Sequence, residues 1–246
     1  MRICITGRSH IAALKKALDD GKRAFQEHEI VFLGAPHNLY YEEVTIEGGT
    51  LRAFGKAAES FLMTSEGKYS RLDPDEFDAI VFYGCYRKPL AVFRSIISLG
   101  RENSDYMSAE FLRACAKSWL YEQATLDRIK AITERSKVQV YLMFEPFDSE
   151  QAKVRQHPEA LVSQELRQII YDGLAEATAD VGATAIFQPD ETIVDQVFTL
   201  HKFSVGSTRL SSKEEKHGNE DFSHMNDEYG AIALDHLMHN LEGRVN

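Results

Sequence analysis

The chain has 246 residues, of which 43% are hydrophobic and 27% charged, so it can bury a core and is not disordered by composition. Its formal net charge of −10 argues against nucleic-acid binding, because phosphate backbones repel an acidic protein. Three widely spaced cysteines form neither a metal-binding pair nor a disulfide framework, and we find no signal peptide or membrane span. We therefore expect one cytoplasmic domain over 1–246, without membrane or nucleic-acid partners and with its oligomeric state open.

Strand-like and helix-like segments alternate along the chain, which predicts an α/β fold with a parallel sheet covered on both faces. Segment 54–70 is ambiguous, because Gly55 weakens a fair helical pattern. In chain order, the other expected elements are a strand at 2–6, a helix from Ile11 to Gly21, a strand at 29–33, a hairpin at 44–51, a strand at 78–83, a helix after Pro89, a helix capped by Ser108, a strand at 138–144, a helix from Ser163 to Val181, a strand at 183–187 and a helix at 226–241.

Glycines and prolines follow the predicted strands, at Gly7, Gly84, Pro146 and Pro189. In a parallel sheet the carboxyl ends of the strands share one edge, and ligands bind beyond it. We expect the residues near these four positions to meet there. The polar segment 211–220 is a solvated loop or a flap over that edge.

Ser9 lies between the first strand and the first helix. A helix N-terminus offers unpaired N–H groups and a partial positive charge, and both would stabilise an oxyanion beside a serine nucleophile. Taken alone, Ser9 fits an ordinary helix N-cap better. A dinucleotide site is disfavoured because the turn has one glycine, Gly7, and a phosphate-binding P-loop is absent.

Asp221 and His224 stand three residues apart, just before the last predicted helix. A serine hydroxyl needs a base to take its proton, and the base needs a partner that orients it. In a tight turn this spacing lets the carboxylate reach the imidazole N–H. A surface Asp and His are the alternative, since the chain has nine histidines.

The two motifs together resemble the SGNH (GDS-like) hydrolase superfamily. Gly7-Arg8-Ser9-His10 is similar to its first motif, and Asp221-Phe-Ser-His224-Met-Asn-x-x-Tyr229-Gly230 is similar to its last. The resemblance spans most of the chain and implies a flavodoxin-like three-layer α/β/α sandwich with a five-stranded parallel sheet. It implies Ser9 as nucleophile, His224 as base and Asp221 as its partner.

The middle motifs depart from that family. The resemblance implies an oxyanion hole built from Ser9, Gly34 and Gly84, with Gly48 or Gly49 as alternatives to Gly34. The family's Gly-x-Asn-Asp motif is replaced by Gly84-Cys85-Tyr86-Arg87, so the side-chain donor of the asparagine is missing. Losing one such donor costs about 10²–10³ in rate, which puts vigorous hydrolysis in question.

Other polar residues near the predicted edge are candidates for substrate binding. Arg87 can bind a carboxylate or phosphate or form a surface ion pair, and Arg209 has the same two alternatives. His10 is a further substrate-contact candidate, although a core or supporting role fits it better. Cys85 fits a small buried residue better than a thiol nucleophile. Asp235-His236-x-x-His239 has helical metal-ligand spacing but fits a solvated face, so we expect neither metal nor cofactor.

Three functions remain open at this point. The first is an acyl ester hydrolase, acting on acetyl esters of a carbohydrate or small molecule. The second is an acyltransferase with the same triad, in which a sugar hydroxyl replaces water during polysaccharide modification. The third is a catalytically silent binding protein on the same fold.

Overall fold

Five parallel strands form the central sheet of the computed structural model, in the order β2-β1-β6-β7-β8. This is the flavodoxin-like strand order, with its switch point between β1 and β6. The strand bounds are β1 Arg2–Gly7, β2 Glu29–Gly34, β6 Ala79–Tyr83, β7 Gln139–Met143 and β8 Thr184–Ile186. All five predicted strands and the parallel sheet are confirmed.

The structure describes residues 1–36, 38–84, 88, 90–102, 107–152, 162–210, 215–218 and 220–243. Pro89, expected in the first turn of a helix, lies outside these ranges. None of the described helices is both long enough and apolar enough to cross a bilayer.

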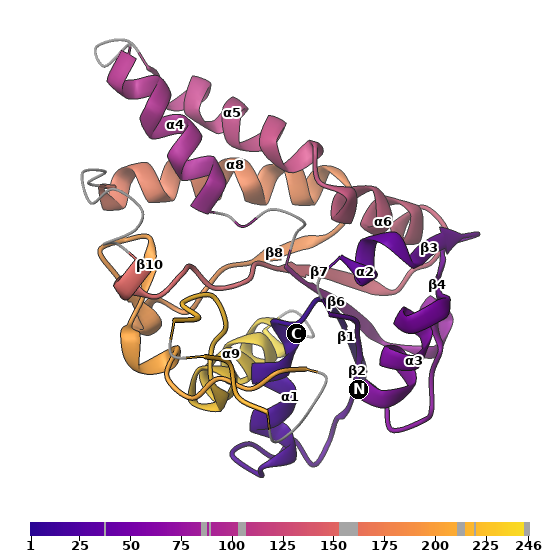
Figure 1. Cartoon of the computed structure of the whole chain (residues 1–246). Helices are drawn as coiled ribbons and strands as arrows, with labels where there is room; N and C mark the ends of the chain where they lie inside the picture. The colour runs from indigo at the N-terminus through magenta and orange to yellow at the C-terminus, as the bar shows by residue number, and fades with distance from the viewer. Residues whose placement is uncertain are drawn as a thin grey trace.

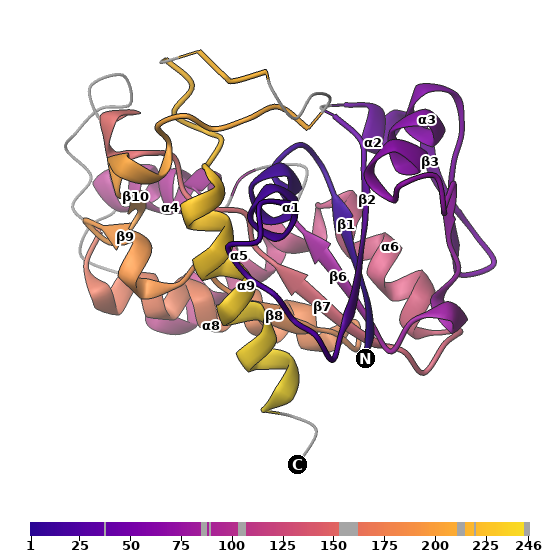
Figure 2. The same ribbon diagram turned by 90° about the horizontal axis from the view of Figure 1, so that it is seen from below.

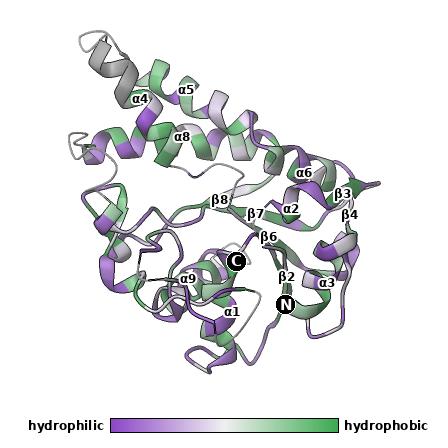
Figure 3. Ribbon diagram, in the orientation of Figure 1, coloured by the Kyte–Doolittle hydropathy of each residue, from purple (hydrophilic) through white to green (hydrophobic). Residues whose placement is uncertain are grey.

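Helices cover both faces of the sheet, which gives three layers (Figure 1). Alternate strand residues face opposite ways: Cys4 of β1 belongs to one hydrophobic core, whereas Ile3 and Ile5 belong to the other. Apolar residues concentrate along the central strands (Figure 3). Packed on the Cys4 side are α2 Leu39–Glu42, α3 Gly55–Thr64, α4 Leu90–Glu102, α5 Ala109–Tyr121, α6 Ala124–Thr133 and α8 Gln164–Asp180; on the other side are α1 Ile11–Asp19 and α9 Asp227–Glu242.

The predicted cap at Ser108 is confirmed, and Ser163, which was predicted to begin a helix, is also a cap. The Ser108 hydroxyl accepts a hydrogen bond from the Phe111 backbone N–H at 3.2 Å. The Ser163 hydroxyl does the same for Leu166 at 3.0 Å. Each satisfies an N–H that the first helical turn leaves without a partner.

The predicted hairpin is also present. The ambiguous segment 54–70 contains a helix, α3. Gly55 begins α3 instead of interrupting it, with a φ of +55° that favours glycine. Several short elements were not predicted, because two or three residues carry no readable period. The hairpin strands are β3 Val44–Glu47 and β4 Thr50–Ala53; the short elements are β5 Arg71–Leu72, β9 Ile193–Val194, β10 Phe198–Thr199 and 3₁₀ turns at Pro74–Glu76, Glu150–Ala152, Asp190–Thr192 and His201–Phe203.

Helices α1 and α9, from opposite ends of the sequence, lie side by side on one face of the sheet (Figure 2). Gly230 makes this possible, because a Cβ there would stand 2.0 Å from the Ala13 carbonyl oxygen of α1. The turn after β1, which carries Ser9, and the turn before α9 are therefore held next to each other.

Replacing Gly230 with alanine should destabilise the protein, because backbone atoms of α1 block the new methyl group. An unhindered Gly→Ala change inside a helix would instead stabilise by about 1 kcal/mol. We expect a loss of about 1–3 kcal/mol in the free energy of unfolding, as for other overpacked cores. Urea denaturation measures it, with exposed His239→Ala on the same helix as control. A stabilised Gly230→Ala variant would contradict the close approach.

Candidate active site

Ser9, His224 and Asp221 form a continuous hydrogen-bonded chain. The Ser9 Oγ lies 2.9 Å from the His224 Nε2, and the His224 Nδ1 lies 2.8 Å from the Asp221 Oδ2. The structure thus brings together the three residues that the sequence patterns singled out. Two of them come from the turn before α9 and one from the turn after β1.

Ser9 does not act as the N-cap of α1. The capping position is His10, and no side-chain cap hydrogen bond is found there among the described residues. The Ser9 hydroxyl points instead to His224. Its placement follows from the end of β1 at Gly7 and from the first turn, in which the Ala12 N–H donates to the Ser9 carbonyl at 3.0 Å.

The Asp221 turn is fixed by its own backbone. The Asp221 Oδ1 accepts the backbone N–H groups of Ser223 at 2.9 Å and of His224 at 3.1 Å. Asn226 then caps α9 with its Oδ1, and its Nδ2 donates to the Lys202 and Val205 carbonyls. The three-residue spacing therefore works as expected, because the local turn aims the carboxylate at the imidazole.

The pKa of Asp221 determines which ring nitrogen of His224 carries the proton. Burial opposes ionisation, but hydrogen bonds from the His224 ring and from the backbone outweigh it and hold the pKa of Asp221 well below its ordinary value of 3.8. An ionised carboxylate only accepts hydrogen bonds. A neutral His224 therefore carries its proton on Nδ1, and its bare Nε2 accepts the Ser9 hydroxyl proton.

The His224 ring is stacked between two other imidazoles. His10 lies on one face at 4.6 Å between ring centroids and 12° between planes. His217 lies at 4.0 Å and 9°. The His217 Nδ1 also contacts the Asp221 Oδ2 at 2.8 Å, so one carboxylate oxygen faces two imidazoles.

The buried carboxylate of Glu145 contacts the two residues that flank Ser9, Arg8 and His10. Its oxygens lie 3.1 and 3.2 Å from the Arg8 Nη2, and one lies 3.1 Å from the His10 Nε2. Burial raises the pKa of Glu145, opposed by Arg8 and Lys88. Burial also lowers the pKa of His10 well below 6.5, and the positive charges near it act in the same direction. His10 is thus neutral and donates to Glu145.

The two glycines implied as oxyanion donors use their amides elsewhere. The Gly34 N–H donates to the buried Thr64 hydroxyl at 3.1 Å, and the Gly84 N–H donates to the Met143 carbonyl at 2.8 Å. Gly84 instead makes room for Glu145, whose Oε2 would lie 3.0 Å from a Cβ. Among the described residues, no acceptor is found for the Ser9 N–H, which leaves it available as a donor.

The substrate-binding candidates have different outcomes. Arg209 pairs with Glu215 at 3.0 Å on a half-exposed surface, which matches the ion-pair alternative. His10 is buried and contacts Glu145 and His224. Asp235 of α9 is exposed and pairs with Arg23. Arg87 and Cys85 lie outside the described residues.

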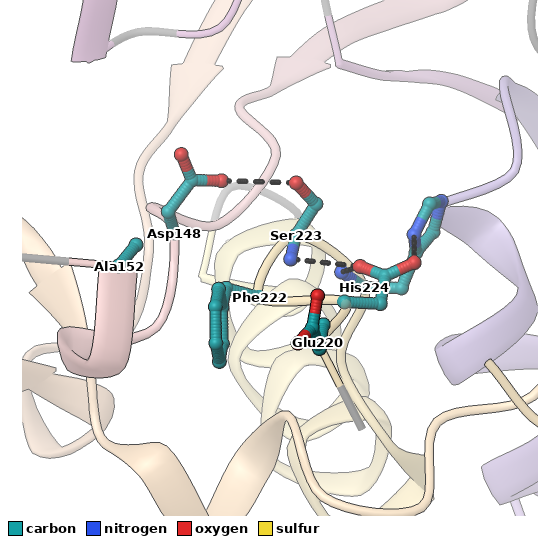
Figure 4. A pocket seen from close by; sticks show the side chains of 7 residues that line it. Asp148, Ala152, Glu220, Phe222, Ser223 and His224 are labelled. Carbon is teal, nitrogen blue, oxygen red and sulfur yellow. Dashed lines mark hydrogen bonds and ion pairs between the residues drawn. The ribbon is translucent and has the colours of Figure 1, made fainter. Parts of the chain in front are cut away.

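A cavity of about 480 Å³ opens beside Asp221 and His224. Figure 4 shows its wall, with the Ser223 hydroxyl turned toward Asp148 and His224 at one side. Asp148 pairs in turn with Lys88, and the Ser149 N–H donates to the Phe222 carbonyl at 2.8 Å. The loop after β7 and the Asp221 turn are thereby joined. The cavity is lined by Asp148, Ala152, Glu220, Asp221, Phe222, Ser223 and His224.

Sequence reasoning missed Glu145, Asp148 and His217. Glu145 had a usable signal, because it is an acidic residue between the apolar end of β7 and Pro146 at the predicted ligand-binding edge. His217 lies in a polar stretch without periodicity, where nothing distinguishes it from other histidines.

Comparison with known proteins adds no further identification. No family model matches the chain, and no curated protein matches it.

Replacing His10 with glutamine should flatten the dependence of stability on pH below neutrality. The lowered pKa of folded His10 means that the unfolded chain binds a proton that the folded chain does not. The contribution of His10 to the free energy of unfolding is complete above about pH 6.5 and is lost as the pH falls toward the pKa of folded His10. The free energy of unfolding changes over this range by at most about 1.4 kcal/mol per pH unit.

Urea denaturation between about pH 5 and pH 7 measures this slope. His239→Gln, which removes an exposed imidazole, is the matched control. An unchanged slope in His10→Gln would show that His10 is not held neutral.

Proposed function

We propose that this chain is an SGNH-type hydrolase that uses a serine nucleophile to cleave acyl esters. The observation that carries the proposal is the chain of contacts from the Ser9 Oγ through His224 to Asp221. A hydroxyl against a bare imidazole nitrogen, with the other nitrogen held by a carboxylate, is the arrangement that activates a serine. The likeness of both terminal motifs to that superfamily supports the same function.

The chemistry follows from the proton positions. As the Ser9 Oγ attacks the ester carbonyl carbon, its proton moves to the His224 Nε2, and Asp221 stabilises the imidazolium. His224 then protonates the leaving alkoxide, which departs and leaves an acyl group on Ser9. Water, deprotonated by the same nitrogen, attacks this acyl group. The bond between the acyl carbon and the Ser9 Oγ breaks, His224 returns the proton to that oxygen, and the carboxylic acid is released.

The tetrahedral intermediate needs donors for its oxyanion. The Ser9 N–H is one, and the start of α1 adds the partial positive charge of a helix N-terminus. Gly34 and Gly84 direct their amides elsewhere, so this site has fewer backbone donors than the resemblance implies. We infer slow hydrolysis on that ground.

The substrate class we favour is an acetyl or other short acyl ester of a carbohydrate or small molecule. The cavity beside His224 has polar and acidic groups that accept hydrogen bonds from hydroxyls, including Asp148 and Ser223. A hydroxyl bound there serves as leaving group in hydrolysis, or as acceptor if the same triad transfers the acyl group.

A second candidate, ligand binding without turnover, is favoured by one observation. Both glycine amides expected in the oxyanion hole are engaged, and the asparagine donor is absent from Gly84-Cys85-Tyr86-Arg87. A site with this few donors can bind an ester and leave it intact.

Covalent labelling with a fluorophosphonate probe tests the proposal. We expect label on Ser9, located by mass spectrometry, and its loss in Ser9→Ala and His224→Ala. Asp221→Asn should lower turnover of short p-nitrophenyl esters by about 10⁴-fold, because the imidazole loses the partner that fixes its tautomer.

Exposed Ser95→Ala on α4 is the control and should label like the wild type. If the wild type is folded but shows neither label nor turnover, hydrolysis is rejected and the binding candidate takes its place.

A further inference from the structure

We propose that His217, Asp221 and His224 form a binding site for a divalent transition-metal ion, best suited to zinc, and that occupancy switches off the activity at Ser9. The metal site stands on geometry alone; the switch rests on the proposed function. None of the three residues needs to move far to bind an ion, and one of them is the proposed base.

The donor atoms already converge. The Nδ1 atoms of both histidines lie 2.8 Å from the same Asp221 oxygen, and the three ligand atoms lie within 4.8 Å of one another. Donors on a tetrahedral zinc ion, with bonds of about 2.0–2.1 Å, are about 3.3 Å apart. Each imidazole therefore has to withdraw from the carboxylate by only about half an ångström.

The donor set suits zinc by type as well as by distance. Two imidazoles and one carboxylate, with a fourth position for water, are a common zinc environment. Hard cations such as Mg²⁺ prefer oxygen ligands and are disfavoured by the two nitrogens. All three side chains are partly exposed, between 14% and 22%, so an ion can reach them from solvent.

The surroundings attract a cation. Glu220 and Asp148 carry further carboxylates on the wall of the adjoining cavity, although Asp148 also contacts Lys88. The whole chain has a net charge of −10. One positive charge opposes this attraction, because Arg209 lies near His217. Arg209 is itself paired with the Glu215 carboxylate.

Metal binding inverts the tautomer of the proposed base. A metal ion takes the Nδ1 lone pair, so the proton that each neutral ring carried on Nδ1 moves through solvent to Nε2 of the same ring. No proton is lost or gained overall. The His224 Nε2 then carries a hydrogen and can no longer accept the Ser9 proton, which is the step that attack requires.

His217 is what adds this property to the triad. A serine, histidine and aspartate alone offer only two donors at this position, Asp221 and His224. The third donor, His217, comes from segment 215–218. The His217 backbone N–H donates a hydrogen bond to the Ser207 carbonyl at 2.8 Å, and a β-bridge joins Lys216 to Thr208, so this segment is held against the rest of the fold. Removing its imidazole leaves an incomplete metal site.

Zinc binding to the full chain, stripped with EDTA and dialysed, is the direct test. Competition with a chromophoric chelator should show one site in wild type and equally in Ser9→Ala, because Ser9 is not a ligand. His217→Gln and Asp221→Asn should weaken binding by at least about tenfold. Cobalt added to the wild type should give the intense visible absorption of a tetrahedral site.

His239→Gln is the matched control, because Asp235-His236-x-x-His239 on α9 is the competing metal-like pattern. Its zinc affinity should equal that of the wild type. The metal site is overturned if the wild type does not bind zinc, if His217→Gln binds as tightly as wild type, or if His239→Gln is the variant that loses binding.

The switch is tested by ester hydrolysis with and without zinc, expressed as the ratio of the two rates within each variant. Zinc should lower the wild-type rate, EDTA should restore it, and the ratio in His217→Gln should return toward one. A rate of ester hydrolysis that rises when zinc is added would overturn the proposed inhibition by zinc. If the wild type binds zinc but hydrolyses no ester, the metal site stands and the proposed function, together with the switch, fails.

Discussion

The close approach of α1 and α9 is the constraint on which the site depends. Ser9 and His224 are 215 residues apart in the sequence, and no local turn brings them together. The glycine at position 230 lets the first and last helices touch through their backbones on one face of the sheet. Because both helices begin at the carboxyl edge of the strands, packing them together sets the distance between Ser9 and His224.

The second organising element is one carboxylate. Asp221 has two backbone N–H groups on one oxygen and two imidazoles on the other. The backbone bonds fix its orientation, and its ionised state fixes where the histidine protons lie. The same oxygen therefore orients the His224 ring and, together with the His217 and His224 imidazoles, forms the ligand set of the proposed metal site.

Sequence patterns predicted the strands and the long helices, because alternation and cap residues are local signals. Motif spacing singled out Ser9, Asp221 and His224, which the structure brings into hydrogen-bond contact. Sequence patterns failed where a distant side chain decides the outcome. Gly34 was expected to donate to an oxyanion, but the Thr64 hydroxyl from α3 takes its amide, and that helix was the ambiguous segment. Glu145 approaches Gly84 only through tertiary folding, whereas His217 lies four residues before Asp221 in a polar stretch that has no readable period.

The two imidazoles on the faces of His224 have a consequence for its motion. A ring held at both nitrogens and covered on both sides at 4.0 and 4.6 Å has no room to turn over about its Cβ–Cγ bond. A base on an open surface must be oriented anew before each proton transfer, at a cost in entropy. Here the orientation of the His224 ring is fixed during folding by the stacked rings of His10 and His217.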